Sequence, residues 1–514
     1  TMYAFRAFKA KVFSMRARVP LHPMVTRAAA VSVVGVGVSM CTKLAISEGS
    51  SGDNFSVNTL MGIGMESKAE GWFSSFGSSA RKLKLDHITD WRDNKAIEHP
   101  LLRRESPLCS NFANREEYVL LPPPGQNIHR RDQDSVWICR AGPRKDIYFD
   151  PKKTKAAIVT CGGLCPGLNT VIQGIVRTLQ FTYGVEEIYG IPLGYSGIYS
   201  REWHKLTASD VRDIHRNGGS CLGSSRGGWD LERIMDSLQS KGINQLYVIG
   251  GDGTHRGAQK LHEEARARGM NMIVAGVPKT IDNDIPFLDH SFGFRTSVGE
   301  AIRAIESAYT EANGAPNCIG LVKVMGRQAG FIAMQASIAS RCVNCCLIPE
   351  MNIDKDKFLL YLKDRLEKKH NAVIVVAEGA GSTLCSAKDS LGFDKSGNPI
   401  LPDVGIWLKG EISKFMKKEG FEYNLKYIDP TYMIRSVPAS ADDQLLCTLL
   451  ANHAVHGAMN GFSGFTVGQL NHKFVLVPIS EVTKKSRKVN TKSRMFCRLL
   501  LNTGQPDFTP DGKQ

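Results

Sequence analysis

Three glycine-rich turns in this 514-residue chain follow apolar segments and carry residue types that handle phosphorylated ligands. They span residues 162–169, 250–254 and 276–286. In an open parallel sheet, ligands bind beyond the carboxyl ends of the strands, and the N–H groups of a following helix suit a phosphate. Asp252 could hold Mg²⁺, which prefers one or two carboxylates together with phosphate oxygens and water. Asp282 could accept a proton from a hydroxyl. The pattern predicts phosphoryl transfer.

Asp284 is a second candidate base, although an aspartate in the pattern TIDND is more typical of a turn cap. Three arginines lie in loop-like contexts: Arg226 in GSSRGG, Arg327 in VMGRQAG and Arg435 in YMIR. Arginine makes bidentate contacts to phosphate. One such arginine is usually a surface residue, but three together indicate an anionic substrate.

Several familiar nucleotide-binding signatures are absent from the sequence. The chain has no GxxxxGK[ST] motif, which excludes a P-loop enzyme, and no HRD loop, which excludes a protein kinase. The glycines of GDGTHRG are spaced wrongly for the dinucleotide motif GxGxxG. The phosphate-binding turns therefore point to another class of kinase.

The net charge of +15 is concentrated near the two ends of the chain. Residues 1–50 and 481–500 each hold seven Lys or Arg and one acid, so these stretches account for 12 of the 15 charges. The middle is nearly balanced and holds no recognisable nucleic-acid-binding module, so we expect no nucleic-acid partner. The basic run 484–498 is expected to be a solvated surface. No run of about 18 apolar residues predicts a membrane span.

The thirteen cysteines are odd in number and scattered along the chain, which favours free thiols in a reducing compartment. Cys161 with Cys165, and Cys342 with Cys345 and Cys346, lack a second CxxC or HxxxH at zinc spacing. We expect structural thiols, with redox regulation or metal binding as the alternative.

The first residues are basic, almost free of acids and followed by an apolar stretch, as in organelle transit peptides. We therefore expect residues 1–80 to be a transit-like leader and a flexible Ser/Gly-rich linker, and the location to be a plastid, with the cytoplasm as the alternative. Residues 81–150 are expected to form an N-terminal extension, and residues 481–514 a basic C-terminal tail.

From Lys155 onward, β-branched segments alternate with helical patterns and glycine turns, which predicts an α/β fold with mostly parallel sheets sandwiched by helices. An apolar stripe predicts a helix over residues 296–313. The clearest predicted strands are residues 156–161, 245–250, 272–277, 319–324 and 372–377.

Over roughly residues 85–502, the sequence resembles the phosphofructokinase family. The resemblance rests on the motifs GGLCPGLN, GYSGIYS, LGSSRGG, IGGDGT, PKTIDNDI, VKVMGRQAGFIA, LIPE, AEGAG and YIDPTYMIR. RAGPR, LPDVGIWL and HGAMNGFSGFTVG further resemble the plant-type, ATP-dependent branch. The resemblance implies two Rossmann-like lobes with the active site between them. The ATP-binding lobe would comprise residues 151–293 and 437–480, and the fructose 6-phosphate-binding lobe residues 294–436.

The implied reaction is phosphorylation of fructose 6-phosphate at its 1-hydroxyl by ATP with Mg²⁺, the committed step of glycolysis. Asp282 would be the base, and Asp252 would hold the metal through the phosphates. The ATP-binding residues implied by the resemblance are Gly163, Arg226, Gly227, Gly251, Asp252, Gly253 and Thr254. The substrate-binding residues implied are Thr280, Ile281, Asp282, Met325, Gly326, Arg327, Glu378, Tyr432, Met433, Ile434 and Arg435.

Two positions bear on the phosphoryl donor. Pyrophosphate-dependent relatives carry Asp where this chain has Gly253, and that carboxylate would repel the α-phosphate of ATP. Lys279 is instead typical of pyrophosphate-type enzymes. The combination resembles plant and trypanosomatid ATP enzymes, so ATP is the expected donor. A pyrophosphate-dependent enzyme is the first alternative, and a non-catalytic regulatory subunit is the second.

A homo-oligomer, dimer or tetramer, is also implied by the resemblance. Cys318 stands where bacterial relatives place an arginine that reaches the neighbouring subunit's sugar phosphate, and Lys426 is a candidate substitute. The bacterial effector site is therefore not carried over to this chain.

Overall fold

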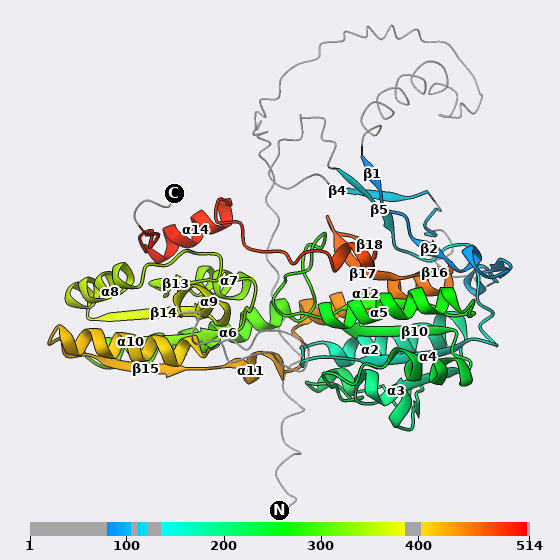
Figure 1. Cartoon of the computed structure of the whole chain (residues 1–514), viewed down its shortest axis with the longest axis horizontal. Coiled ribbons are helices and arrows are strands. Elements are labelled where there is room, and N and C mark those ends of the chain that lie inside the picture. The colour runs from blue at the N-terminus through cyan, green and yellow to red at the C-terminus, as the bar shows by residue number, and fades with distance from the viewer. Residues whose placement is uncertain (1–79, 104–110, 115, 122–134, 386–401, 511–514) are drawn as a thin grey trace, which may run out of the picture. The chain divides into compact units, whose positions relative to one another are not determined.

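The computed structural model describes residues 80–103, 111–114, 116–121, 135–385 and 402–510. Apart from Ala80, the expected leader and linker lie outside these residues. In the described part of the chain, the longest strands fall into two sheets, and Figure 1 shows helices packed against both.

The first sheet has ten strands in the described residues, ordered β1-β5-β18-β17-β11-β10-β7-β8-β9, with β4 paired to β5. Its centre, β17-β11-β10-β7-β8, is parallel. Antiparallel pairs flank that centre, since β18 runs against β17 and β5, and β9 against β8. The bounds are β1 Arg81–Lys82, β4 Tyr118–Leu121, β5 Val136–Arg140, β7 Lys155–Thr160, β8 Glu187–Ile191, β9 His204–Lys205, β10 Gln245–Gly250, β11 Ile273–Pro278, β17 Phe465–Leu470 and β18 Lys473–Pro478.

Alternate residues of the central strands enter different hydrophobic clusters, as the period of a strand requires. Ile158 and Tyr247 pack with α2 and α12, whereas Val159 and Val248 pack with α4 and α5. The sheet is therefore covered by helices on both faces, which explains why its strands are apolar throughout. The bounds of these helices are α2 Leu168–Arg177, α4 Leu231–Ser240, α5 Asp252–Ala267 and α12 Ala441–Met459.

The second sheet has four parallel strands in the described residues, in the order β13-β14-β12-β15. Its helices form two contacting pairs, α6 with α7 and α8 with α10, and both pairs pack against the strands. The short helices α9 Gly381–Leu384 and α11 Thr431–Arg435 follow β14 and β15. The remaining bounds are β12 Cys318–Val324, β13 Cys345–Leu347, β14 Asn371–Ala377, β15 Asn424–Ile428, α6 Phe294–Asn313, α7 Phe331–Ser340, α8 Lys355–Lys369 and α10 Val404–Lys418.

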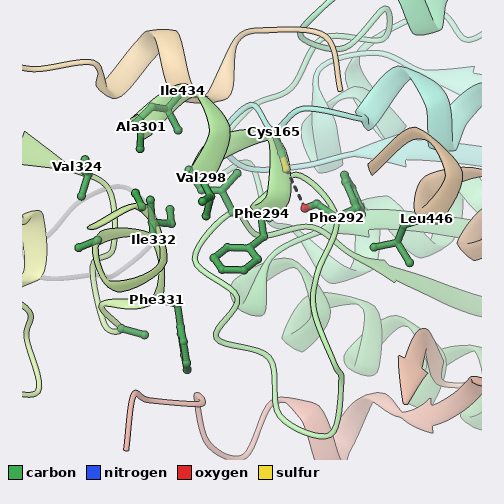
Figure 2. Packing of buried hydrophobic residues seen from close by; sticks show 14 of the residues in the cluster. Cys165, Phe292, Phe294, Val298, Ala301, Val324, Phe331, Ile332, Ile434 and Leu446 are labelled. Carbon is green, nitrogen blue, oxygen red and sulfur yellow. Dashed lines mark hydrogen bonds between the residues drawn. The ribbon is translucent and has the colours of Figure 1, made fainter. Parts of the chain in front are cut away.

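Helix α6 leads the chain from the first sheet to the second. Figure 2 shows Phe294 and Val298 of this helix beside Phe331 of α7, with Phe292 and Cys165 close by. The Cys165 thiol donates to the Phe292 carbonyl at 3.4 Å. All five residues belong to one buried cluster, so the apolar packing is continuous from the strand ends of the first sheet to the second.

Residues 481–510 differ from the solvated run expected from their charges. Most of their Lys and Arg side chains are exposed, as expected, but Arg487 is half-buried. The chain continues from α13 (Ile479–Val482) to α14 (Arg494–Thr503), and α14 packs on α7. Val489, Phe496, Leu499 and Phe508 are buried. The sequence pattern was dominated by charge, which concealed these anchoring apolar positions.

Small two-stranded sheets complete the described fold: β2 (Asp86–His87) with β16 (Phe462–Ser463), and β3 (Ile97–Glu98) with β6 (Asp146–Ile147). The α/β prediction is confirmed, and the five predicted strands and the predicted helix lie within one residue or two of β7, β10, β11, β12, β14 and α6. No helix among the described residues is long and apolar enough to cross a membrane.

Candidate active site

Three cationic side chains converge on the glycine turn after β7. Lys279 is buried, and its Nζ donates to the Gly163 carbonyl at 2.7 Å. A Cβ on Gly163 would lie 3.4 Å from Nη1 of Arg435 and 3.6 Å from Nη2 of Arg226. Burial lowers the pKa of Lys279, and the neighbouring charges of Arg226 and Arg435 act in the same direction. A cluster of like charges around a bare backbone is suited to an anion.

One side-chain and one backbone hydrogen bond fix the loop that carries Arg226 to the turn after β7. The Ser224 hydroxyl donates to the Gly162 carbonyl at 2.6 Å, and the Gly162 N–H donates to the Ser225 carbonyl at 3.0 Å. Gly227, with φ of +82°, then turns the chain away through a conformation that favours glycine. Arg226 is thus held at the rim of the turn after β7.

The turn after β10 opens α5 and leaves its first turn accessible. Gly251 precedes the helix and has no side chain to cap it, and Asp252 is the first helical residue. Among the residues that the structure describes, a Cβ on Gly253 would meet only Nη2 of Arg256, at 3.8 Å, so there is space above this turn. The Thr254 carbonyl is held by the Tyr195 hydroxyl at 2.7 Å. An accessible helix N-terminus provides N–H donors and a favourable dipole for phosphate.

Asp282 and Asp284 lie in the turn after β11, close to other acids. The Arg327 N–H donates to Oδ2 of Asp282 at 3.4 Å, whereas the buried Oδ1 receives no hydrogen bond from the described residues. Burial raises the pKa of Asp282, and Asp284 and Glu378 raise it further. Burial and Asp252 likewise raise the pKa of Asp284. This group of carboxyls has an electrostatic preference for a proton or a cation.

Local hydrogen bonds order the same turn. The Thr280 hydroxyl donates to Oδ1 of Asp284 and accepts from the Asp282 N–H, both at 3.1 Å. The Ser291 hydroxyl donates to the Thr280 carbonyl at 2.7 Å. Ile281 is buried in the core, so its side chain anchors the turn. The two aspartates are therefore held by a rigid scaffold.

The second sheet contributes residues from the ends of β12 and β14. Gly326, at φ of +130°, allows a turn in which a Cβ would lie 2.7 Å from the Ala329 carbonyl. Arg327 and Met325 flank it and are half-buried. Glu378 follows β14, and burial raises its pKa against the opposing charges of Arg327, Lys323 and Arg435. Arg327 thus contacts Asp282 through its backbone N–H, and its positive charge acts on Glu378.

Helix α11 presents a mixed group of side chains. Tyr432 and Met433 are exposed, whereas Ile434 is fully buried among core residues (Figure 2). The Arg435 guanidinium lies 5.0 Å from the centre of the Tyr432 ring, and its buried Nε has no hydrogen-bond partner in the described structure. Arg435 lies near the Gly163 turn, since its Nη1 would be 3.4 Å from a Cβ on Gly163.

A model of the family described as Phosphofructokinase matches residues 155–458, more than half of the chain. The chain belongs to the phosphofructokinase family. ATP-dependent 6-phosphofructokinase 7 of Arabidopsis thaliana is 50% identical over 385 residues, covering 74% of this chain and 79% of the relative. ATP-dependent 6-phosphofructokinase 4, chloroplastic, of the same plant is 49% identical over 405 residues, covering 77% and 76%. The resemblance to the plant-type branch of the phosphofructokinases is confirmed.

Solved phosphofructokinase structures share the fold. The pyrophosphate-dependent enzyme from Marinobacter aquaeolei aligns with a TM-score of 0.56 and 20% identity, covering 70% of this chain and 94% of that chain. Phosphofructokinase from Pichia pastoris in the T-state gives 0.53 and 24%, covering 64% and 35%. At these identities, the likeness supports the α/β architecture alone.

Sequence reasoning missed a connecting segment, residues 483–490, beside the phosphofructokinase motifs. The Ser486 hydroxyl donates to Oδ2 of Asp252 at 3.3 Å. The Arg487 N–H donates to the Asp284 carbonyl, and its guanidinium donates to the Leu288 carbonyl at 2.8 Å. The same guanidinium lies 5.1 Å from the Phe331 ring centre. The only sequence signal was one serine within a basic run, which gives no indication of these contacts.

Cys318 and Lys426 lie away from this group of residues. Cys318 is buried at the start of β12, and six residue steps separate it from Val324 at the end that bears the site, a span of about 20 Å. Lys426 is exposed on β15, in register with Gly320. Among the described residues, no group of three or more His, Cys, Asp or Glu forms a metal cluster.

Proposed function

We propose that this chain transfers the terminal phosphoryl group of ATP to the 1-hydroxyl of fructose 6-phosphate, the committed step of glycolysis. The observation that supports this proposal most directly is the environment of the Asp282 carboxyl. The charges of two other acids raise the pKa of this carboxyl, its Oδ1 accepts no hydrogen bond from the described residues, and cationic side chains gather at the nearby turn after β7. The ATP-dependent activity in the names of relatives near 50% identity supports this reading.

In the proposed reaction, the sugar 1-oxygen bonds to the γ-phosphorus as the bond to the β–γ bridging oxygen breaks. ADP leaves, and the hydroxyl proton moves to Oδ1 of Asp282. A raised pKa makes this carboxylate a stronger base, and general-base catalysis is typically worth about 10²–10⁴-fold. Oδ2 remains oriented by the Arg327 N–H. The products are fructose 1,6-bisphosphate and ADP.

ATP would lie along the turns after β7 and β10. Gly163, Arg226 and Gly227 would contact its phosphates from one side, and the accessible N–H groups of residues 251–254 from the other. The space above Gly253 leaves room for an α-phosphate, which supports ATP over pyrophosphate. Lys279 bonds the Gly163 carbonyl and would add positive charge beneath the phosphates.

Asp252 and Asp284 fit a site for Mg²⁺, which would neutralise charge on the phosphate oxygens when bound. After burial, the negative charge of Asp252 is the next cause of the raised pKa of Asp284, so a cation shared by the two carboxyls would relieve their repulsion. Oxygen donors of this kind suit a hard divalent ion that also takes phosphate and water ligands. Ser486 and the connecting segment would keep Asp252 oriented.

Fructose 6-phosphate would bind between the two sheets' strand ends. Arg435 would pair with the 6-phosphate, since its Nε is unpartnered in the described structure, and Arg327 would lie near the transferred group. Glu378 and the turn at Met325 and Gly326 would contact sugar hydroxyls. Backbone groups of residues 432–434 and the turn at Thr280 and Ile281 would complete the pocket.

The proposal also includes the site residues, the lobe boundaries, the plastid location and a homo-oligomer. The lobe boundaries are those given in the sequence analysis, with the substrates held between the lobes. A fluorescent fusion of residues 1–80 tests the leader: signal in plastids is expected, and diffuse cytosolic signal would favour the cytoplasm.

The reaction itself is tested by ³¹P NMR of the full chain incubated with ATP, Mg²⁺ and fructose 6-phosphate. We expect a new sugar-phosphate resonance at C1 that grows as ADP appears. Phosphate at another carbon would overturn the substrate assignment. Folded protein that binds ATP but forms no product would favour a regulatory subunit.

A further inference from the structure

A cavity of about 900 Å³ lies outside the site described above, against β2, β6 and β16. Its lining residues, none of which belongs to the proposed active site, include His87, Phe112, Arg144, Lys145, Asn460 and Phe462. Its volume is within the range of small-molecule sites. The phosphoryl-transfer proposal gives this cavity no role, and none to the RAGPR motif that ends at Arg144.

Arg144 is a buried guanidinium without an acidic partner in the described structure. It is only 8% exposed, and its Nη2 donates to the Cys139 thiol at 3.2 Å. Its guanidinium lies 4.5 Å from the centre of the Phe462 ring. Nε has no hydrogen-bond partner in the part of the chain that the structure describes. A buried charge left unpaired is strongly unfavourable, so such a residue calls for an anion.

Asn460 supplies a second unsatisfied group on the same cavity wall. It is 2% exposed, and its Nδ2 donates to the Gly142 carbonyl at 3.0 Å, which fixes the orientation of the amide. Its buried Oδ1 receives no hydrogen bond from the described residues. Buried polar atoms are almost always hydrogen-bonded, so this oxygen lacks a donor. Lys145, exposed at the cavity, adds a second positive charge.

We propose that this cavity is a second ligand site that binds a small organic anion bearing a hydroxyl group. The carboxylate or phosphate of the ligand would pair with Arg144 and Lys145, and its hydroxyl would donate to Oδ1 of Asn460. Phe112 and Phe462 would pack against its carbon atoms. The site is independent of the phosphoryl-transfer chemistry proposed above.

The proposal predicts an unusual stability signature for Arg144→Gln. Without ligand, the variant loses an unpaired buried charge, so its melting temperature should equal or exceed that of the wild type. A purely structural arginine would lower the melting temperature when replaced. Arg140→Gln is the matched control, because Arg140 is exposed and already paired with Glu117 at 3.2 Å.

Binding is tested by isothermal titration of the full chain with malate and with glycerol 3-phosphate, which carry the two head groups. Titration in the Arg435→Gln background removes binding of anions at the proposed 6-phosphate position. We expect saturable binding of at least one probe, weakened roughly tenfold or more by adding Arg144→Gln but unchanged by Arg140→Gln. Succinate, which lacks the hydroxyl of malate, tests the contact with Asn460 and should bind more weakly than malate.

Each result decides the proposal. Saturable binding that disappears with Arg144→Gln, in a variant at least as stable as its parent, supports the site and identifies the head group. Binding that is insensitive to Arg144→Gln overturns it. No binding of either probe up to about 10 mM, an affinity too weak for a specific site, also overturns it.

Discussion

The charged clusters around Lys323 and Asp282 differ in whether their charges are neutralised by partners of opposite sign. Lys323 lies 2.8 Å from a carboxylate oxygen of Asp403 and 2.7 Å from one of Asp429, and these contacts raise its pKa against the opposing effect of burial. Around Asp282, like charges are gathered instead, and atoms such as Nε of Arg435 have no partner in the described structure. Paired charges stabilise the fold, whereas unmatched charges indicate a ligand that completes them.

The largest expected effect is that of Asp282→Asn. The amide cannot accept the sugar proton, so kcat should fall by at least about 100-fold, while ATP binding is retained. Removing one of three neighbouring acids should leave the melting temperature unchanged or raise it. Steady-state rates, ATP titration and thermal unfolding measure the three quantities. Near-normal turnover would show that Asp282 is not the base.

Arg435→Gln should mainly weaken substrate binding. Loss of a charge-assisted hydrogen bond to the 6-phosphate, worth about 1.5–3 kcal/mol, predicts a KM for fructose 6-phosphate raised roughly 10- to 100-fold. The KM for ATP should change less. Equal losses for both substrates would instead place Arg435 at the transferred phosphate.

Lys323→Met is expected to lower stability, because it removes a cation that is paired with Asp403 and Asp429 and leaves their two carboxylates together. We expect the free energy of unfolding to fall by about 1–3 kcal/mol, measured by urea denaturation. Lys368→Met, which breaks an exposed pair with Asp364, should have a smaller effect. Equal free energies of unfolding for the two variants would contradict the claim that the paired charges around Lys323 stabilise the fold.

Ser486→Ala should have the smallest effect. One hydrogen bond to Asp252 is lost, so the concentration of Mg²⁺ needed for half-maximal rate should rise a few-fold, in line with about 1 kcal/mol or less. Ser480→Ala, an exposed serine in α13, is the matched control. An unchanged Mg²⁺ requirement would mean that the connecting segment does not position Asp252.

Part of the fold and part of the candidate site could be predicted from the sequence. Strands such as β10 and β11 were predictable because residues buried on both faces form continuous apolar runs. The glycine turns and their acids were predictable because turn chemistry is local. The family resemblance supplied Glu378, which follows a strand of the other sheet and lies 96 residues after Asp282, so no local pattern links the two.

Long-range contacts explain what could not be predicted. The contacts of Ser486 and Arg487 with Asp252 and Asp284 join residues about 200 positions apart, and no periodicity encodes them. The antiparallel edge formed by β4, β5 and β18 was missed for the same reason. Arg144 was visible as part of a motif, but only the structure shows that it is buried with its Nε unpartnered among the described residues.

The most direct test of the account compares initial rates with fructose 6-phosphate and Mg²⁺ when ATP or pyrophosphate is the donor. The space above Gly253 predicts turnover with ATP and none with pyrophosphate, and Gly253→Asp should sharply reduce the rate with ATP. Turnover with pyrophosphate but not with ATP would contradict the account and give Lys279 the greater weight.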